Sequence, residues 1–294
     1  MKKLLFILLL FSSTAYGQIF PLVFRTPAAN GCSLFLDDYS GATAAYSFRK
    51  LDCQYAGSSI RVRRSSDNAE SDIGFTAGDD LDTAALKTFV GTGGSDDGFI
   101  VTWYDQSGSA NDATQATGGS QPKIMDNGVI YREGTNNKPT ATYASSFFGL
   151  TSNLASNSNF SIYSVQSRSN TGNRGVGLSN SGNSQPFSAY PFTDGNIYLA
   201  DGTNYIGYAY LLAALGLLES YSISATLSIY NNGAAMIGGI GGALGGAAVF
   251  NAIGNRGGSE FMMGNIQEMI YYPSDKSSTR AAMASNINAY YGIY

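Results

Sequence analysis

The chain has 294 residues, enough for a sizeable core, and its 36 glycines, 20 tyrosines and 13% charged residues favour strands and turns over a helical bundle. It has no histidine, which removes the commonest metal ligand and general base and excludes a zinc site or a Ser-His-Asp triad. We expect no metal and no cofactor. The formal net charge of −4 disfavours nucleic acid and anionic membranes as partners.

Residues 1–17 have the form of a secretory signal peptide. Two lysines precede an apolar run over residues 4–11, and small residues occupy the −3 and −1 positions of a cleavage before Gln18. The alternative, a retained anchor, is disfavoured because the run is too short to span a bilayer. We expect a location that is secreted, at the cell surface or at a virion surface, with 18–31 as a linker or extended lead-in and 32–294 as a single β-sandwich domain.

The only two cysteines are Cys32 and Cys53. In an exported chain, a small even number of cysteines favours a disulfide. It would close a loop of about twenty residues and stabilise the fold by ~3 kcal/mol. The alternative is a pair of separate thiols.

The predicted elements follow in chain order. Alternating apolar and basic residues over 60–63 indicate a strand, and a further strand is expected over 99–104. Between them, a capping aspartate and a terminal glycine bound a short helix near 82–90. From residue 120 onward, strand and turn signals recur about every ten residues, which is typical of an antiparallel sandwich. A second short helix is expected near 277–290.

The segment 233–254 is rich in glycine and carries no charge. The pair Asn232-Gly233 between two apolar runs predicts a hairpin, so the segment starts inside a sheet. Membrane insertion is the disfavoured alternative, since each glycine weakens a helix by about 1 kcal/mol relative to alanine. A homo-oligomer contact through 233–254 is also left open, because small residues let backbones approach closely.

The stretch "WYDQSGSANDATQAT", residues 103–117, looks like the edge of a site. Its Asp105 and Gln106 support two interpretations. An aspartate followed by Gln-Ser-Gly can form an Asx-type turn that binds its own backbone, and we favour this structural role for both residues. The alternative is a ligand site.

Three segments occur here in a characteristic order: "AAYSFRKLDCQYAGSSIRVRRSSDNAESDIGF", "LDTAALKTF" and "YDQSGSANDATQA". Together they resemble the amino-terminal part of the catalytic domain of the arabinofuranosidase B family, over residues 44–117. The similarity resumes more weakly over 264–275. The resemblance implies an all-β, concanavalin A-like fold, an antiparallel jelly-roll β-sandwich similar to laminin-G modules, and it implies a glycan as partner.

The resemblance also indicates where the catalytic carboxylates of the family would align. A retaining glycosidase needs one carboxylate as nucleophile and a second as acid and base. Ala189 stands in the zone of the nucleophile, within "PFSAYPF", and Asn255 and Arg256 stand in the zone of the acid/base residue, within "AIGNRGGSEF". The matched zones therefore predict a protein without turnover.

We expect a glycan-binding or interaction module that is not an enzyme. Tyrosine rings can present flat apolar faces to sugar rings, and the candidate ligand residues are Tyr190, Tyr198, Tyr205 and Tyr208. The first alternative is an active arabinofuranosidase-like hydrolase with relocated carboxylates, for which the candidates are Asp201 and Glu268. The second alternative is a purely structural surface or virion protein.

Overall fold

The computed structural model describes residues 31–294 with the exception of 95, 157–158, 169–176, 183–185, 192–195, 210–214, 225, 238 and 244–248. The expected signal peptide and all of the expected lead-in except Gly31 lie outside the described residues. Among the helices in the described part of the chain, none combines the length and the apolar character needed to cross a membrane.

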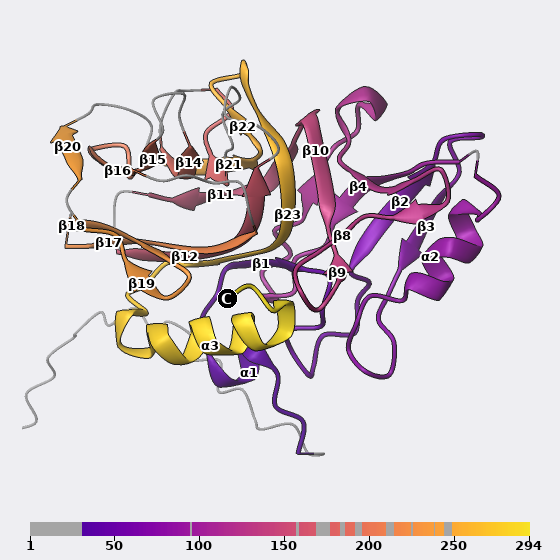
Figure 1. The fold of residues 1–294 in the computed structure, drawn as a ribbon, viewed down its shortest axis with the longest axis horizontal. Coiled ribbons are helices and arrows are strands. Elements are labelled where there is room, and N and C mark those ends of the chain that lie inside the picture. Colours follow the sequence, from indigo (N-terminus) through magenta and orange to yellow (C-terminus); the bar gives the residue numbers. More distant parts are fainter. Residues whose placement is uncertain are drawn as a thin grey trace, which may run out of the picture.

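Two antiparallel sheets face each other (Figure 1). The first runs from β19 through β18, β17, β12 and β23 to β1 and β10, and continues through β6, β4, β2 and β3. Its strands, with β7 beside β6, are β1 (Ala44–Ser47), β2 (Ile60–Arg64), β3 (Glu70–Ile73), β4 (Gly98–Trp103), β6 (Lys123–Asp126), β7 (Val129–Ile130), β10 (Ala141–Ser146), β12 (Phe160–Arg168), β17 (Gly216–Ile223), β18 (Thr226–Asn231), β19 (Ala234–Ala235) and β23 (Glu260–Tyr272).

The second sheet begins at β5, which also pairs with β4, and ends at β20. In spatial order its strands are β5 (Ala113–Thr114), β11 (Phe148–Ala155), β21 (Val249–Ile253), β13 (Leu178–Ser179), β14 (Phe187–Pro191), β15 (Asn196–Ala200), β16 (Asn204–Ala209) and β20 (Ile240–Ala243). Two small pairings complete the fold, β8 (Arg132–Glu133) with β9 (Lys138–Pro139), and β22 (Asn255–Arg256) with the start of β23. The antiparallel β-sandwich expected from the sequence is confirmed.

The core has two parts because side chains alternate along each strand. On β12, Phe160 and Ile162 face the space between the sheets, where the sole tryptophan, Trp103, stacks on Phe48 with ring centroids 4.8 Å apart. The next residue, Tyr163, faces outward. There it packs in a second apolar cluster beneath the helices α1 (Phe35–Asp38) and α3 (Arg280–Tyr291), which lie against the first sheet (Figure 1).

The two helices expected from local signals are confirmed. In α2 (Thr83–Val90), the carboxylate of Asp82 caps the helix by accepting a hydrogen bond of 2.9 Å from the backbone of Ala85. A 3-10 turn at Ser277–Thr279 precedes α3, and Gly292 ends it in the left-handed conformation. Another 3-10 turn, Gly118–Ser120, lies between β5 and β6.

The glycine-rich tract divides between the two sheets. Asn232 and Gly233 both have positive φ, 52° and 77°, and connect β18 to β19, which confirms the hairpin. Further along, Ile237 is 90% exposed, whereas Phe250 in β21 is fully buried. The oligomer contact through 233–254 stays a prediction.

Cys32 and Cys53 form a disulfide with a Cα–Cα distance of 6.1 Å. It ties the segment before α1 to the loop after β1. Asp37 lies beside it and accepts hydrogen bonds from the backbone N–H groups of Leu34 and Cys53, both 3.0 Å. Among the described residues, Cys32, Cys53 and Asp37 form a cluster of side chains of the kinds that bind metals. Because the two cysteines are joined in the disulfide, this cluster has no thiol that could bind a metal.

Candidate functional site

Asp105 closes the turn after β4. Its Oδ1 accepts hydrogen bonds from the backbone N–H groups of Ser107 and Ala45, at 2.9 and 2.8 Å. Its Oδ2 accepts from the hydroxyl of Ser107 and the backbone of Asn111, at 2.8 and 3.0 Å. The side chain is 4% exposed. All these partners belong to the protein's own loop and to β1, which is the structural role that the sequence favours for Asp105.

Gln106 is fully buried and holds the loop that follows β1. Its amide oxygen accepts from the backbone of Leu51 at 2.8 Å, and its amide nitrogen donates to the carbonyls of Ser47 and Arg49 at 3.1 and 3.0 Å. The amide therefore satisfies backbone groups at the end of β1 and in the loop that follows it. Asp105 and Gln106 together lock the polar stretch against β1.

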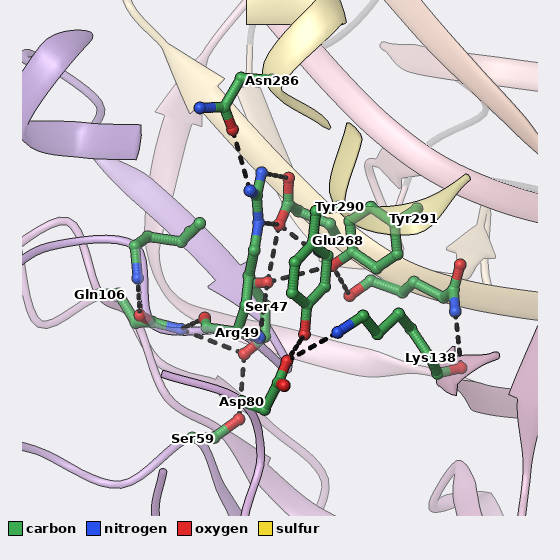
Figure 2. Close-up of polar contacts among 12 residues, drawn as sticks. Ser47, Arg49, Ser59, Asp80, Gln106, Lys138, Glu268, Asn286, Tyr290 and Tyr291 are labelled. Carbon is green, nitrogen blue, oxygen red and sulfur yellow. Dashed lines mark hydrogen bonds and ion pairs between the residues drawn. The ribbon is translucent and has the colours of Figure 1, made fainter. Parts of the chain in front are cut away.

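Glu268, a candidate for a relocated catalytic carboxylate, is in a buried ion pair (Figure 2). Its two oxygens accept from Arg49, Nε to Oε2 at 2.8 Å and Nη2 to Oε1 at 3.0 Å, and Oε2 also accepts from the hydroxyls of Ser47 and Tyr291. Arg49 also donates to Asn286 of α3. Burial lowers the pKa of Arg49, but the charge of Glu268 and its hydrogen bonds, together with the neighbouring Tyr290 and Tyr291, raise that pKa above its usual value. The carboxylate connects β23 to β1 and α3.

Asp201, the other candidate, ends β15 in a tight turn. Its Oδ1 accepts from the backbone N–H groups of Thr203 and Asn204, at 2.8 and 2.7 Å. The side chain is 3% exposed. This is the Asx-turn geometry that we expected for Asp105. At Asp201 the turn also holds Asn204, the first residue of β16.

The structure does not bring Asp201 and Glu268 together. Directly paired residues of antiparallel strands point to the same face. Glu268 pairs with Val165, whose side chain lies on the face beneath the helices. Asp201 instead accepts a hydrogen bond from Ser222. Ser222 pairs with Phe160, whose side chain lies on the inner face. The two side chains therefore lie on opposite faces, about 16 Å apart along β12. A retaining pair needs about 5.5 Å, so this pairing was wrong.

Two of the candidate tyrosines form an aromatic surface on the outer side of the second sheet. Tyr198 of β15 and Tyr205 of β16 are half-buried, with ring centroids 6.3 Å apart. They pack against the buried ring of Phe187 in β14, and Arg256 lies over that ring at 4.5 Å. We call Phe187, Tyr198, Tyr205 and Arg256 the tyrosine face. Asn196 borders it, with its amide 3.3 Å from the hydroxyl of Tyr198.

The other two candidates differ from this pair. Tyr208 is only 7% exposed and belongs to the core between the sheets, so its prediction as an exposed ligand residue was wrong. Tyr205 and Tyr208 are an odd number of residues apart in one strand, which sends them to opposite faces. Tyr190 pairs with Tyr198 in the backbone register, but its side chain lies outside the described residues.

The two zones that the resemblance assigns to catalysis meet at the tyrosine face. β14 carries Ala189 and β22 carries Asn255 and Arg256, and the contact of Arg256 with Phe187 joins them. Asn255 is 4% exposed, and its side-chain oxygen has no hydrogen-bond partner among the described residues. Arg256 forms an ion pair with Glu260 at the start of β23. The zone around β22 therefore holds the amide of Asn255 and the ion pair of Arg256 with Glu260.

Glu219 is a further buried carboxylate, on the outer face of β17. It is fully buried, and burial raises its pKa to about 7 despite the opposing effect of Arg280, whose Nη1 lies 3.3 Å from Oε1. Glu219, Arg280 and Phe187 were not singled out from the sequence. The signal for Glu219 was a lone charge within the apolar run "GLLESYSI"; the Arg280 partner had no comparable local signal.

Comparison with known proteins gives the family. The catalytic-domain model of alpha-L-arabinofuranosidase B matches residues 31–203. No curated protein sequence matches the chain. Two solved structures share the fold. One is an arabinofuranosidase complexed with arabinofuranosyl-alpha-1,2-xylobiose, with 17% sequence identity and a TM-score of 0.62. The other is a GH54 a-l-arabinofuranosidase soaked with a cyclic sulfate inhibitor, with 16% sequence identity and a TM-score of 0.61.

Each comparison covers 85% of this chain but 63% of the other, so the chain spans less than two thirds of the length of these enzymes. Their names describe what those proteins bind, and at such low identity the likeness concerns the fold alone. The family match is independent of them and extends over more than half of the 294 residues. The chain therefore belongs to the family of the alpha-L-arabinofuranosidase B catalytic domain.

Proposed function

We propose that this protein is a secreted or surface-exposed glycan-binding module of the arabinofuranosidase B family that lacks glycosidase turnover. The observation that carries the proposal is the tyrosine face. Two half-buried rings, Tyr198 and Tyr205, lie side by side on the outer side of the second sheet, at the junction of the two strands that the resemblance associates with the sugar.

Sugar binding suits this chemistry. Aromatic rings offer flat apolar surface to the C–H face of a sugar, and polar side chains beside them fix its orientation through hydrogen bonds. Asn196 and Arg256 supply amide and guanidinium groups at the border of the tyrosine face. Such contacts need no ionisable group, so binding can persist where hydrolysis does not.

The lack of turnover is supported by the residue types in the matched zones. Ala189 cannot attack an anomeric carbon, and neither Asn255 nor Arg256 can donate and then accept a proton at neutral pH. Glu268 and Asp201 are occupied in an ion pair and a turn on opposite faces of the fold. Glu260 is paired with Arg256.

An active hydrolase is the second candidate, and a specific observation favours it. Glu260 lies beside the tyrosine face through its ion pair with Arg256. Its carboxylate would be one of the two that such an enzyme needs.

The test measures catalysis and binding on one preparation of the mature protein. We expect no release of nitrophenol from 4-nitrophenyl α-L-arabinofuranoside, together with saturable binding of arabinofuranosyl-xylobiose or another glycan found on an array. Tyr198→Ala and Tyr205→Ala should each weaken that binding by about tenfold, because a stacked ring contributes roughly 1–1.5 kcal/mol. Tyr198→Phe should retain most of it.

The matched control is Tyr104→Ala, which removes a tyrosine that directly follows β4 and donates to Asp72 of β3, in the first sheet rather than the second. It should bind glycan like the wild type. Turnover that is abolished by Glu260→Gln would establish the hydrolase instead. The absence of both turnover and glycan binding would leave a structural surface protein.

A further inference from the structure

A hollow of about 170 Å³ lies on the outer side of the first sheet, between α3 and the turn that joins β18 to β19. Its walls include residues from both elements: Gly233, Arg280, Ala281, Ala284, Ser285 and Tyr294. Figure 1 shows α3 and β19 next to each other, on the side of the first sheet that faces away from the second. The tyrosine face belongs to the second sheet, so the hollow is a separate site.

The hollow exists because the side chains around it are small. Ala281, Ala284 and Ser285 follow one another at helical spacing along α3 and present only methyl and hydroxymethyl groups. Asn288, the next residue on this side, is held by hydrogen bonds with the backbone of Ile293 and Tyr294. Opposite them stands Gly233, where a Cβ would lie 3.1 Å from the hydroxyl oxygen of Tyr294. The ring of Tyr294, a residue 55% exposed, thus closes one side of the hollow.

The charged group in the wall is Arg280. Its Nη1 donates to the carbonyl of Gly233 at 3.1 Å and approaches both oxygens of Glu219 at 3.3 and 3.5 Å, and the guanidinium lies over the ring of Tyr230 at 4.2 Å. The contacts of the described residues engage Nη1 and the face of the guanidinium. The edge formed by Nε and Nη2 is the one that can bind a planar carboxylate with two parallel hydrogen bonds.

We propose that this hollow binds a small organic carboxylate of monosaccharide size, with the guanidinium of Arg280 holding the carboxylate and the hydroxyls of Ser285 and Tyr294 available to its other oxygens. The volume of about 170 Å³ supports this size, because pockets that enclose drug-sized ligands measure about 300–1,000 Å³. The proposal does not depend on glycan binding at the tyrosine face.

Glu219 makes the charge of this site depend on pH. Its neighbours with titratable or charged groups are Arg280, Tyr163, Tyr221, Tyr230 and Tyr294. Arg280 is the cation among them, and the other four are tyrosines. Because burial raises the pKa of Glu219 to about 7, its carboxyl is mostly neutral at pH 6 and mostly ionised at pH 8. An anionic ligand therefore meets an uncompensated Arg280 at pH 6 and a neutralised one at pH 8.

The experiment measures binding of D-glucuronate, D-glucose and acetate to the intact protein by calorimetry at pH 6 and pH 8. Glucuronate remains ionised at both values. We expect it to bind about tenfold more tightly at pH 6, because the ionised Glu219 repels the anion at pH 8. A neighbouring like charge shifts a protonation equilibrium by about one pKa unit or more, which corresponds to about tenfold. Glucose, the neutral sugar of the same size, should not bind. Acetate should bind more weakly because it leaves most of the hollow empty.

Three variants locate the site. Ser285→Phe fills the hollow from an exposed helix position and leaves the pair of Arg280 and Glu219 intact, so it should abolish glucuronate binding. Glu219→Gln should bind glucuronate equally well at pH 6 and pH 8. Arg280→Gln should lose binding, with Arg61→Gln, an exposed arginine of β2 that is paired with Glu70, as the matched control that keeps it.

Circular dichroism spectra must show that each variant is folded before its binding is interpreted. Glucuronate binding that persists in Ser285→Phe, equal binding of glucose, or no detectable binding by the folded wild type would each overturn the proposal. Loss of glycan binding at the tyrosine face, with glucuronate binding unchanged, would contradict the proposed function alone.

Discussion

At the scale of single residues, the buried carboxylates hold the fold together. Glu268 is an example. Its sequence position made it a candidate for a catalytic role, whereas its contacts in β23 are those of a structural residue. Both oxygens are occupied by Arg49, and two hydroxyls complete the shell. A carboxylate held in this way has no oxygen left for an anomeric carbon.

Glu268→Gln tests this role. The amide cannot compensate the charge of Arg49, which stays buried, so we expect a loss of about 3–5 kcal/mol in the free energy of unfolding. Urea unfolding followed by the fluorescence of the buried Trp103 measures it. The double substitution Arg49→Met with Glu268→Met is the control, since removing both charges should cost less than removing one. A Glu268→Gln variant with wild-type stability and altered sugar chemistry would contradict the structural role.

Asp105→Ala tests the turn after β4. The substitution removes the acceptor for three backbone N–H groups, those of Ala45, Ser107 and Asn111. We expect the free energy of unfolding to fall by about 1–3 kcal/mol, because the buried donors lose their partner. Glycan binding by the folded fraction should match that of the wild type. Wild-type stability with lost binding would instead make the stretch a ligand site.

At the scale of elements, glycines in β16 and β20 shape the tyrosine face. The ring of Tyr198 lies against Gly207, where a Cβ would come within 2.2 Å of the ring, and the ring of Tyr205 lies against Gly242, where it would come within 2.7 Å. Each ring therefore lies flat over the neighbouring strand. The glycines set the orientation of the rings that we propose to contact sugar.

Gly207→Ala should therefore turn the ring of Tyr198 away from its strand. We expect glycan affinity to fall about as much as in Tyr198→Ala, while the melting temperature changes little because alanine is tolerated in a strand. Gly149→Ala in β11 is the matched control, since its nearest atom would be 3.9 Å from the new Cβ. Unchanged affinity in Gly207→Ala would show that the ring orientation does not govern binding.

Elements governed by neighbouring residues were predictable from sequence. The helix after Asp82 and the turn at Asn232-Gly233 depend on a cap and on positive φ, both of which are local. The face to which a side chain points also follows from alternation, so the spacing of Tyr205 and Tyr208 already contained the signal that only one of them faces outward.

At the scale of the whole molecule, the disulfide closes the chain segment that carries α1 and β1, with a sequence separation of 21. β1 is a strand of the first sheet, and α1 packs on the outer face of that sheet in one cluster with the carboxyl-terminal helix. The disulfide therefore restrains the amino-terminal end of the described chain against the carboxyl-terminal one.

Replacing Cys32 and Cys53 by serine should lower the free energy of unfolding by about 3 kcal/mol, because the unfolded chain regains the freedom of an open loop. Urea unfolding with the fluorescence of Trp103 measures the change, and the wild type under reducing conditions should show the same loss. An unchanged midpoint in both experiments would show that the crosslink does not contribute to stability.

The sequence by itself determined the antiparallel sandwich, the helix caps, the hairpin and the family, because these depend on short-range patterns and on an ordered set of motifs. Only the tertiary structure decided which carboxylates meet which partners. Arg49 and Glu268 are 219 positions apart, and their pairing depends on the register of β1 against β23. Strand pairing between distant segments also buries Glu219 beneath Arg280 and separates Asp201 from Glu268. Such contacts leave no local trace in the chain, since the energy that selects them comes from packing the whole sheet.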